Sequence, residues 1–373
     1  MSRARDFADL AAAYSGGSPL VGRNMIVNGA FQVDQMKDTF TQTGSGGKKF
    51  LDGWRQGCSN VDQLSVESSR TADAPSSFQG NYSCKIQVKT VESAWAADED
   101  LTVYTNIEGF DCAKLQYGTA NAKKTTLSFW VKSSIAGTFA CNMYMADGNM
   151  AIAQPYTISS ADTWEYKTLT WAANTGQAIT IDNTPGLQVQ WMISVGSNST
   201  GGSDGDEWHT WTANKWAFGH TTNTHVTTDE STFQLTGVQF EIGDVATNYE
   251  HLPYDVELAK CQRYLFRIDA AGNNVTRFGT GQHYSTGGGE AYIAVPVTMR
   301  ATPTLTQTGT AGDYAWYSGN STLECTGVVA IASSASRYLP VVYAYCSGAT
   351  LRAATVLMAD STTSAYLELD AFM

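Results

Sequence analysis

Positive charge is scarce in this sequence. Of its 373 residues, 23 are Lys or Arg and 35 are Asp or Glu, so the formal net charge is -12. A surface that binds DNA or RNA needs clustered basic side chains to replace the counterions of the phosphates. Adjacent lysines occur only at Lys48-Lys49 and Lys123-Lys124. We therefore expect no nucleic acid partner.

Long apolar runs are also missing. No stretch approaches the roughly 20 apolar residues that span a bilayer as a helix, so we expect no membrane insertion. The sequence contains neither the HExxH pattern of metalloproteases nor the lysine-containing phosphate loop of nucleotide-binding enzymes. We therefore predict no catalytic residues and no enzyme activity. Glycoside hydrolysis remains an alternative, because it needs two carboxylates that are close in space but not in sequence.

The seven cysteines form no CxxC pair and show no zinc-ligand spacing. They are Cys58, Cys84, Cys112, Cys141, Cys261, Cys325 and Cys346. An odd number of widely spaced cysteines indicates free, mostly buried thiols in a protein made in a reducing cytoplasm.

What the sequence does contain is typical of β structure. Hydrophobic residues make up 43% and aromatic residues 11%, while only 16% are charged. About ten segments that we predict to be β-strands, such as residues 24–33 and 126–131, are separated by turn signals at intervals of roughly 10 to 20 residues. This pattern predicts an all-β protein with an antiparallel two-sheet sandwich. Its expected core contains Trp54, Phe129, Trp130, Trp164, Trp191 and Phe240.

Residues 233–265 read as a long strand, a polar turn and a short helix. Strict alternation would place Phe233 and Leu235 on one face and Val238 and Phe240 on the other. The change of phase at Thr236-Gly237 predicts a glycine β-bulge. After Pro253, Asp255 suits a helix N-cap, and the following residues suit two or three helical turns.

The first residues predict another short helix. Phe7, Leu10, Ala11 and Tyr14 share one helical stripe, and residues 15–22 read as a linker. This segment lacks the continuous apolar core of a signal peptide. A helix of this length is marginal alone, so it must pack on copies of itself, on another protein or on its own chain.

One series of segments resembles a known family. The segments are NMIVNGAFQV, LDGWRQG, NYSCKIQV, IEGFDCAKLQYGTANAKKTTLSFWVKSSIAGTF, ADTWEYKTLTW and FQLTGVQFEIGDVATNYEHLPYDVELAKCQRY, which span residues 24–264. In this order they are similar to the carbohydrate-binding-module-like jelly roll of bacteriophage tail fibres and virion appendages. The opening SRARDFADLA resembles the start of some phage fibre proteins.

The resemblance implies a structural protein of the virion that is made in the cytoplasm of the bacterial host. It implies a homotrimer that binds other tail proteins through its N-terminus, with Phe7, Leu10, Ala11 and Tyr14 as the anchor, and that attaches to a glycan of the host surface. A glycan depolymerase on the same scaffold, or an architectural connector of the tail, are the alternatives. The family supplies no catalytic residues to transfer.

The expected domain organisation has three parts. Residues 1–22 form the N-terminal helix and linker, which the resemblance assigns to virion attachment. Residues 23–252 form the jelly-roll β-sandwich, and residues 253–373 form a short connecting helix and a smaller C-terminal β domain. We infer that the connecting helix couples the two β domains.

The aromatic segment EWHTWTANKWAFGH is the candidate glycan site. Trp208, Trp211 and Trp216 could stack on sugar rings, with His209 and Asn214 as polar neighbours. Alternatively, these tryptophans fill the core or a contact between protomers.

Metal binding has little support in the sequence. His220 and His225 lie in a Thr-rich segment that reads as a solvated loop. The acidic clusters at residues 98–100 and 204–207 could supply calcium ligands, although neither has the EF-hand order. We expect no metal and no cofactor.

Overall fold

The computed structural model describes residues 22–222, 224–270, 275–319 and 321–373. The chain divides into two compact units, Met1–Tyr254 and Asp255–Met373, which are described separately. The predicted N-terminal helix, with Phe7, Leu10, Ala11 and Tyr14, lies outside the described residues.

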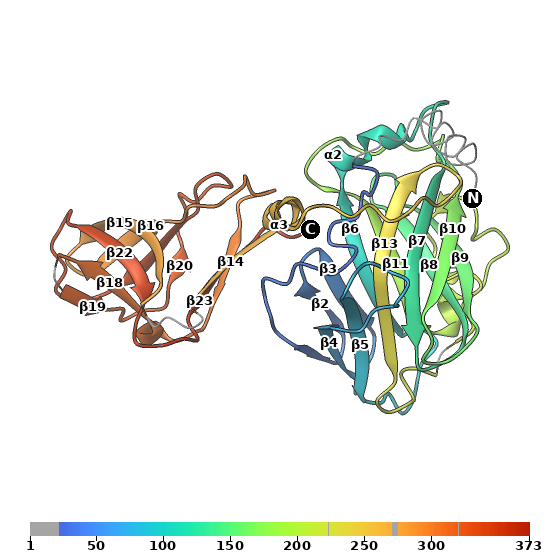
Figure 1. The fold of residues 1–373 in the computed structure, drawn as a ribbon, viewed down its shortest axis with the longest axis horizontal. Helices are drawn as coiled ribbons and strands as arrows, with labels where there is room; N and C mark the ends of the chain where they lie inside the picture. The colour runs from blue at the N-terminus through green and yellow to red at the C-terminus, as the bar shows by residue number, and fades with distance from the viewer. Residues whose placement is uncertain (1–21, 223, 271–274, 320) are drawn as a thin grey trace. The chain divides into compact units, whose positions relative to one another are not determined.

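The first unit is a sandwich of two antiparallel sheets (Figure 1). In spatial order, the first sheet contains β1 (Phe40–Thr43), β4 (Ser65–Thr71), β5 (Ser83–Thr90), β13 (Thr232–Ile242), β7 (Thr125–Ser133) and β10 (Glu165–Trp171). The second contains β12 (His209–Thr210), β9 (Met150–Ile158), β8 (Gly137–Met145), β11 (Pro185–Val195), β6 (Asp100–Glu108), β3 (Trp54–Ser59) and β2 (Gly46–Leu51). The chain changes sheet repeatedly between β5 and β13. The predicted antiparallel all-β sandwich is confirmed.

The core between the sheets is aromatic at its centre. The Trp54 and Trp191 ring centroids are 5.5 Å apart, and Phe129 meets Trp191 edge-on at 5.6 Å. Four of the six expected core residues are fully buried, but Trp130 and Trp164 are not among them. Alternation along β7 turns Trp130 to the outer face, since its neighbour Phe129 faces the core. The Trp164 indole instead donates a hydrogen bond to Asp73 at 3.2 Å.

β13 contains the predicted bulge. Its pairing with β7 shifts register between Thr236 and Gln239, and Gly237 has a φ of 59°. The extra residue returns Val238 and Phe240 to the same core face as Phe233 and Leu235. The predicted bulge is therefore confirmed, and it keeps one long strand buried on a single face.

Residues 24–33, which the sequence suggested as a strand, are irregular. Asn28 and Phe31 have positive φ angles, which a strand does not allow. Asparagine side chains take the place of a ladder here. Asn24 donates to Val238 O at 3.0 Å and accepts from Phe240 N at 3.0 Å, so it fastens this segment to β13.

Gly29 also allows residues 24–29 to lie close to the backbone of β13. A Cβ at this position would lie 2.1 Å from the Val238 carbonyl oxygen. Only glycine therefore allows the two backbones to come so close. Beyond the bulge, residues 24–29 thus supply the hydrogen bonds that β5 supplies to the first half of β13.

The second unit is a smaller antiparallel β domain that follows α3 (Tyr254–Gln262). Its three-stranded sheet contains β14 (Leu265–Asp269), β23 (Tyr366–Asp370) and β17 (Thr304–Gln307). Its seven-stranded sheet contains β19 (Ser321–Glu324), β18 (Tyr314–Ser318), β22 (Ala354–Ala359), β15 (Arg277–Ser285), β16 (Gly288–Tyr292), β21 (Val341–Tyr345) and β20 (Ala330–Ile331). Asp255 lies in the first turn of α3 and not at its N-cap, because the helix begins one residue earlier.

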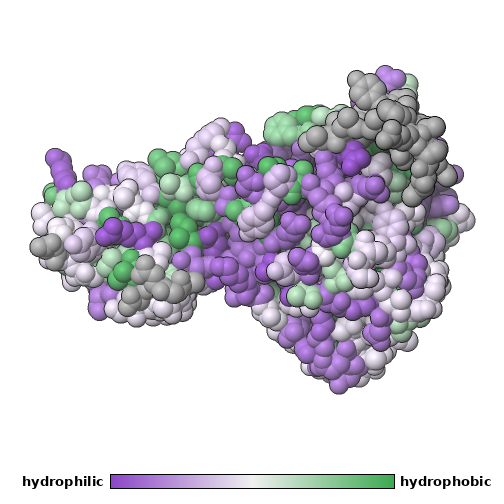
Figure 2. Space-filling model, in the orientation of Figure 1, coloured by the Kyte–Doolittle hydropathy of each residue, from purple (hydrophilic) through white to green (hydrophobic). Residues whose placement is uncertain are grey.

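All seven cysteines are free and buried, as predicted. In the described part of the chain, no helix is long and apolar enough to cross a membrane. The visible face of the sandwich is largely hydrophilic (Figure 2). Two exposed hydrophobic side chains, Phe110 of α2 (Gly109–Cys112) and Ile181, lie where α2 is hydrogen-bonded to Asp182.

We predict that Asn24→Ala destabilises the sandwich by about 2–3 kcal/mol, because it leaves buried backbone groups of residues 26, 238 and 240 without their partner. Urea unfolding of the purified protein measures this change. Asn121→Ala, at an exposed position, is the matched control and should leave the midpoint unchanged. Equal midpoints for the two variants would contradict the role given to Asn24.

Candidate functional site

A row of polar side chains crosses the outer face of the second sheet. Register places Arg55 of β3 opposite Tyr104 of β6, Tyr104 opposite Gln190 of β11, and Gln190 opposite Asn142 of β8. Each of these strands buries its alternate residues in the core, so the row faces outward. Gln188 is on the same face of β11 as Gln190 and is hydrogen-bonded to it.

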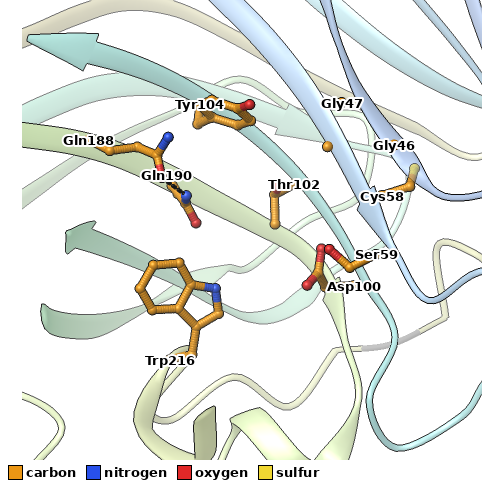
Figure 3. A pocket seen from close by; sticks show the side chains of 11 residues that line it. Gly46, Gly47, Cys58, Ser59, Asp100, Thr102, Tyr104, Gln188, Gln190 and Trp216 are labelled. Carbon is orange, nitrogen blue, oxygen red and sulfur yellow. Dashed lines mark hydrogen bonds between the residues drawn. The ribbon is translucent and has the colours of Figure 1, made fainter. Parts of the chain in front are cut away.

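Tyr104 and Gln190 of this row, together with Gln188, line a cleft of about 330 Å³. In Figure 3, Tyr104 and Trp216 stand on opposite sides of the opening, with Gln188, Gln190 and Thr102 between them. Asp100 and Ser59 close the end beneath the hairpin of β2 and β3. The volume is at the lower end of the range for small-molecule sites.

Glycines keep one side of the cleft open. Gly47 and Gly57 are paired across β2 and β3, and both line the cleft. A Cβ on Gly57 would lie 3.0 Å from the Thr102 hydroxyl and 3.4 Å from the Tyr104 ring. A side chain here would fill the space in front of Tyr104.

The loop that follows β11 forms the opposite wall. It lies on the outer face of the second sheet through a small apolar cluster of Ala140, Met192, Val195 and Ala217. Asn142 donates to the Trp216 carbonyl at 2.8 Å, and the Trp216 ring meets Tyr144 edge-on at 5.6 Å. These contacts hold the Trp216 indole at the edge of the cleft.

The electrostatics of the cleft are dominated by neutral groups and one carboxylate. Among the described residues that line it, Asp100 is the sole acid, and none is Lys or Arg. Burial raises the pKa of Asp100 from 3.8 to about 6, against the opposing effect of hydrogen bonds from Ser59. Burial also raises the pKa of Tyr104, which therefore remains a hydroxyl donor at neutral pH. Amides, hydroxyls and an indole face suit a neutral, hydroxyl-rich ligand.

The predicted aromatic site is divided by the structure. Trp216 lines the cleft, and Trp211, 40% exposed, meets the Trp216 ring edge-on at 6.0 Å. Trp208 turns toward the sandwich core and donates to Ala172 O at 2.7 Å. His209 pairs with β9 as part of β12, and its Nδ1 contacts Glu207 O at 2.9 Å.

Asn214, the other predicted polar neighbour, belongs to the single turn η3 (Ala213–Lys215). It is exposed and accepts a hydrogen bond from Thr212 at 2.9 Å. It lies next to the segment that carries Trp216 but does not line the cleft.

The interpretation of His220 and His225 as solvated loop residues is wrong. Both side chains are buried, and His225 Nε2 is 2.8 Å from the Ser133 hydroxyl. Burial lowers the pKa of His225 to about 3, so it is neutral across the physiological range. The described residues contain no cluster of three metal-ligating side chains.

The two acidic clusters have other partners. Asp100 lines the cleft, Glu99 accepts a hydrogen bond from Ala96 N at 2.7 Å, and Asp204 forms an ion pair with Lys215. Residues 201–205 read GGSDG and so match the G-x-S-x-G pattern of hydrolases. Ser203 nevertheless lies in an exposed bend and not in a strand-to-helix turn, so the nucleophile geometry of that motif is not present there.

Tyr104, Gln188 and Gln190 were not predicted from the sequence as site residues. A signal for the glutamines existed, because LQVQW alternates apolar and amide residues along β11. Alternation reveals an outward polar face but not which strands lie beside it. Only the register of β3, β6 and β11 assembles the row.

No protein-family model matches the sequence, and a comparison with curated proteins found no match. Among solved structures, the enzymatically active domain of tailspike protein 4 of bacteriophage CBA120 has 13% sequence identity and a TM-score of 0.33, over 59% of this chain. The matched part is 21% of that tailspike chain, so the similarity covers about a fifth of its length.

Carbohydrate-binding modules show a similarly distant likeness. A family 11 module from Clostridium thermocellum, in complex with a β-1,3-1,4-mixed-linked tetrasaccharide, has 12% identity and a TM-score of 0.27, over 56% of this chain and 100% of its own. TmCBM61 in complex with β-1,4-galactotriose has 10% identity and a TM-score of 0.28, over 60% and 99%. These are distant similarities between β-sandwich folds.

We predict that the charge of Asp100 makes sandwich stability depend on pH. The pKa of Asp100 is higher in the folded state than in the unfolded state, so protonation of its carboxyl favours folding. This contribution to stability is fully present below pH 3.8 and is lost as the pH rises through about 6. Asp100→Asn should therefore gain stability relative to wild type between pH 4 and pH 8, by at most about 3 kcal/mol.

Urea unfolding at several pH values measures this difference. Asp98→Asn, at an exposed neighbouring position, is the control and should show a constant difference from wild type. A difference for Asp100→Asn that does not change with pH would contradict the prediction.

Proposed function

We propose that this chain is a structural subunit of a bacteriophage tail appendage that binds a host-surface glycan through the cleft of its sandwich. The observation that carries the glycan part is the combination of Trp216 with the neutral amides and hydroxyls that line the cleft. A sugar ring presents an apolar face for stacking and hydroxyls that both donate and accept hydrogen bonds. The Gln188 and Gln190 side-chain amides can both donate hydrogen bonds to sugar hydroxyls and accept hydrogen bonds from them.

The composition of the cleft supports binding over hydrolysis. Glycoside hydrolysis uses an acid and a second carboxylate about 5–10 Å apart. Asp100 is the sole carboxylate among the described residues that line the cleft. We therefore propose that the protein is not an enzyme, and that Asp100 serves as an acceptor for sugar hydroxyls.

The appendage part of the proposal rests on the sequence resemblance. Residues 24–264 contain the ordered segments that resemble tail-fibre jelly rolls, and the β-sandwich agrees with that expectation. The proposed assembly is a homotrimer that is attached to the virion through its first residues. The proposed location is therefore the virion.

We predict that Trp216→Ala weakens glycan binding at least about tenfold, because it removes the stacking face at the cleft. Gln190→Leu should have an effect of the same order, since it leaves sugar hydroxyls without a partner. Oligosaccharides from the host surface polysaccharide serve as the probe, and isothermal titration calorimetry measures the affinity. Gln63→Leu, at an exposed position outside the cleft, is the matched control.

The same mixtures separate binding from hydrolysis. If the polymer keeps its size during incubation and the two cleft variants bind weakly, the proposal stands. A fall in polymer mass that wild type causes and Asp100→Asn does not would replace the proposal by a depolymerase. Equal affinities for wild type and both cleft variants would remove the cleft from the function.

We predict that deletion of residues 1–14 leaves a folded, glycan-binding protein that no longer joins virions. Immunogold labelling of particles measures incorporation, and circular dichroism checks the fold. Wild-type particles should carry the label on a tail appendage. Labelled particles from the deletion variant would contradict the proposed anchor of Phe7, Leu10, Ala11 and Tyr14, and unlabelled wild-type particles would contradict the appendage itself.

A further inference from the structure

A second groove, of about 630 Å³, lies on the outer face of the first sheet, on the other side of the sandwich from the cleft. Ser128 and Trp130 of β7 and Gly237 of β13 form its floor. Tyr166 of β10 borders one side. Residues 77–79, 246–249 and 251 border the other.

Aromatic rings stand on both sides of this groove. Trp130 and Tyr166 are directly paired across β7 and β10, with ring centroids 5.2 Å apart. Opposite them, Phe78 meets Tyr249 edge-on at 5.2 Å, and Tyr249 meets His251 at 4.8 Å. Tyr166 is 44% exposed, so a large aromatic face is open to solvent beside the groove.

The β-bulge makes room for these rings. A Cβ on Gly237 would lie 3.0 Å from the Phe78 ring and 3.1 Å from the Trp130 ring. With φ at 59° and no side chain, Gly237 lets Phe78 and Trp130 approach the backbone of β13 from both sides. The feature that keeps β13 in register with the core therefore also shapes the outer surface.

The polar part of the lining is uncharged. Its members are Ser77, Gln79, Ser128, Thr247 and Asn248, and the described lining contains no Asp, Glu, Lys or Arg. Burial lowers the pKa of His251, so this ring is neutral at neutral pH. A charged ligand would find no counter-charge in the groove. A neutral ligand with apolar faces and hydroxyls would find both kinds of partner.

We propose that this groove is a second binding site for a neutral saccharide, independent of the cleft. Sugar rings would stack between the Trp130–Tyr166 side and the Phe78–Tyr249 side, with Gln79 and Asn248 facing their hydroxyls. An extended peptide strand is disfavoured, because the backbone of the floor is already paired with β5, β7 and β10 and has no free edge to offer.

The test uses the full chain and variants that separate the two sites. Trp216→Ala disables the cleft, Tyr166→Ala disables the groove, and a double variant disables both. Phe110→Ala, at another exposed aromatic residue of the sandwich, in α2, is the matched control. The probes are the neutral oligosaccharide fraction of the host surface polysaccharide, β-1,4-galactotriose and xylohexaose, each titrated by calorimetry.

We expect Trp216→Ala to retain saccharide binding at the groove. The double variant should bind the saccharide at least about tenfold more weakly than Trp216→Ala does. Gln79→Ala, an exposed change that spares the aromatic packing, should weaken the same remainder. Loss of all binding in Trp216→Ala alone would overturn the second site and leave the proposed function intact. Absence of binding by wild type to every probe would overturn both.

Two further outcomes would also overturn the proposal. If Tyr166→Ala changes the oligomer mass in light scattering, the groove is a contact between copies of the chain. If a proline-rich peptide binds in a Tyr166-dependent manner and no saccharide does, the groove is a peptide site.

Discussion

The sandwich depends on how β13 stays buried along its whole length. A strand of 11 residues that packs one face on a core must keep strict alternation, and the sequence of β13 breaks it at Gly237. The bulge absorbs the extra residue, so both halves of the strand face the core. The ladder between β13 and β5 ends at Leu235, before the bulge. Residues 24–29 restore the hydrogen bonds there through Asn24 and the close approach of Gly29.

The outward side chains of β13 are polar and buried, so they need hydrogen-bond partners. Gln239 donates to Glu241 at 2.7 Å, and Glu241 accepts from Thr247 N at 2.9 Å. Glu250 in turn accepts from Gly22 N and Asn24 N. This network holds residues 246–251 against the sheet, which places Tyr249 and His251 beside the groove. The same segment therefore provides hydrogen-bond partners for the buried polar groups of β13 and forms the aromatic side of the groove.

The sequence predicted the parts of this fold that depend on local pattern. The bulge was predicted from the change of phase among four apolar residues of β13, and the sandwich from strand-like segments and turns. Residues 24–33 were misread as a strand because an apolar composition does not reveal the positive φ angles of Asn28 and Phe31. The cleft was missed because it depends on register between distant strands. Trp208, Trp211 and Trp216 were predicted together as one site, but the sequence could not sort them into core and surface, since a nearly identical local composition serves both.

The position of both proposed sites on the sheet faces constrains any oligomer of this chain. An oligomer that packed sheet faces together would cover Trp216 or Tyr166, and a covered face binds no saccharide. Contacts between sandwiches would therefore have to use the loops or the edge strands β1, β10, β12 and β2. Shallow saccharide sites gain strength mainly from repetition, because linked sites act at a high effective concentration. If the sheet faces stay uncovered on several copies of the chain, an oligomer would bind a repetitive glycan more tightly than one site does. The requirement for uncovered faces therefore limits how the chain can assemble and also allows an oligomer to bind through several sites at once.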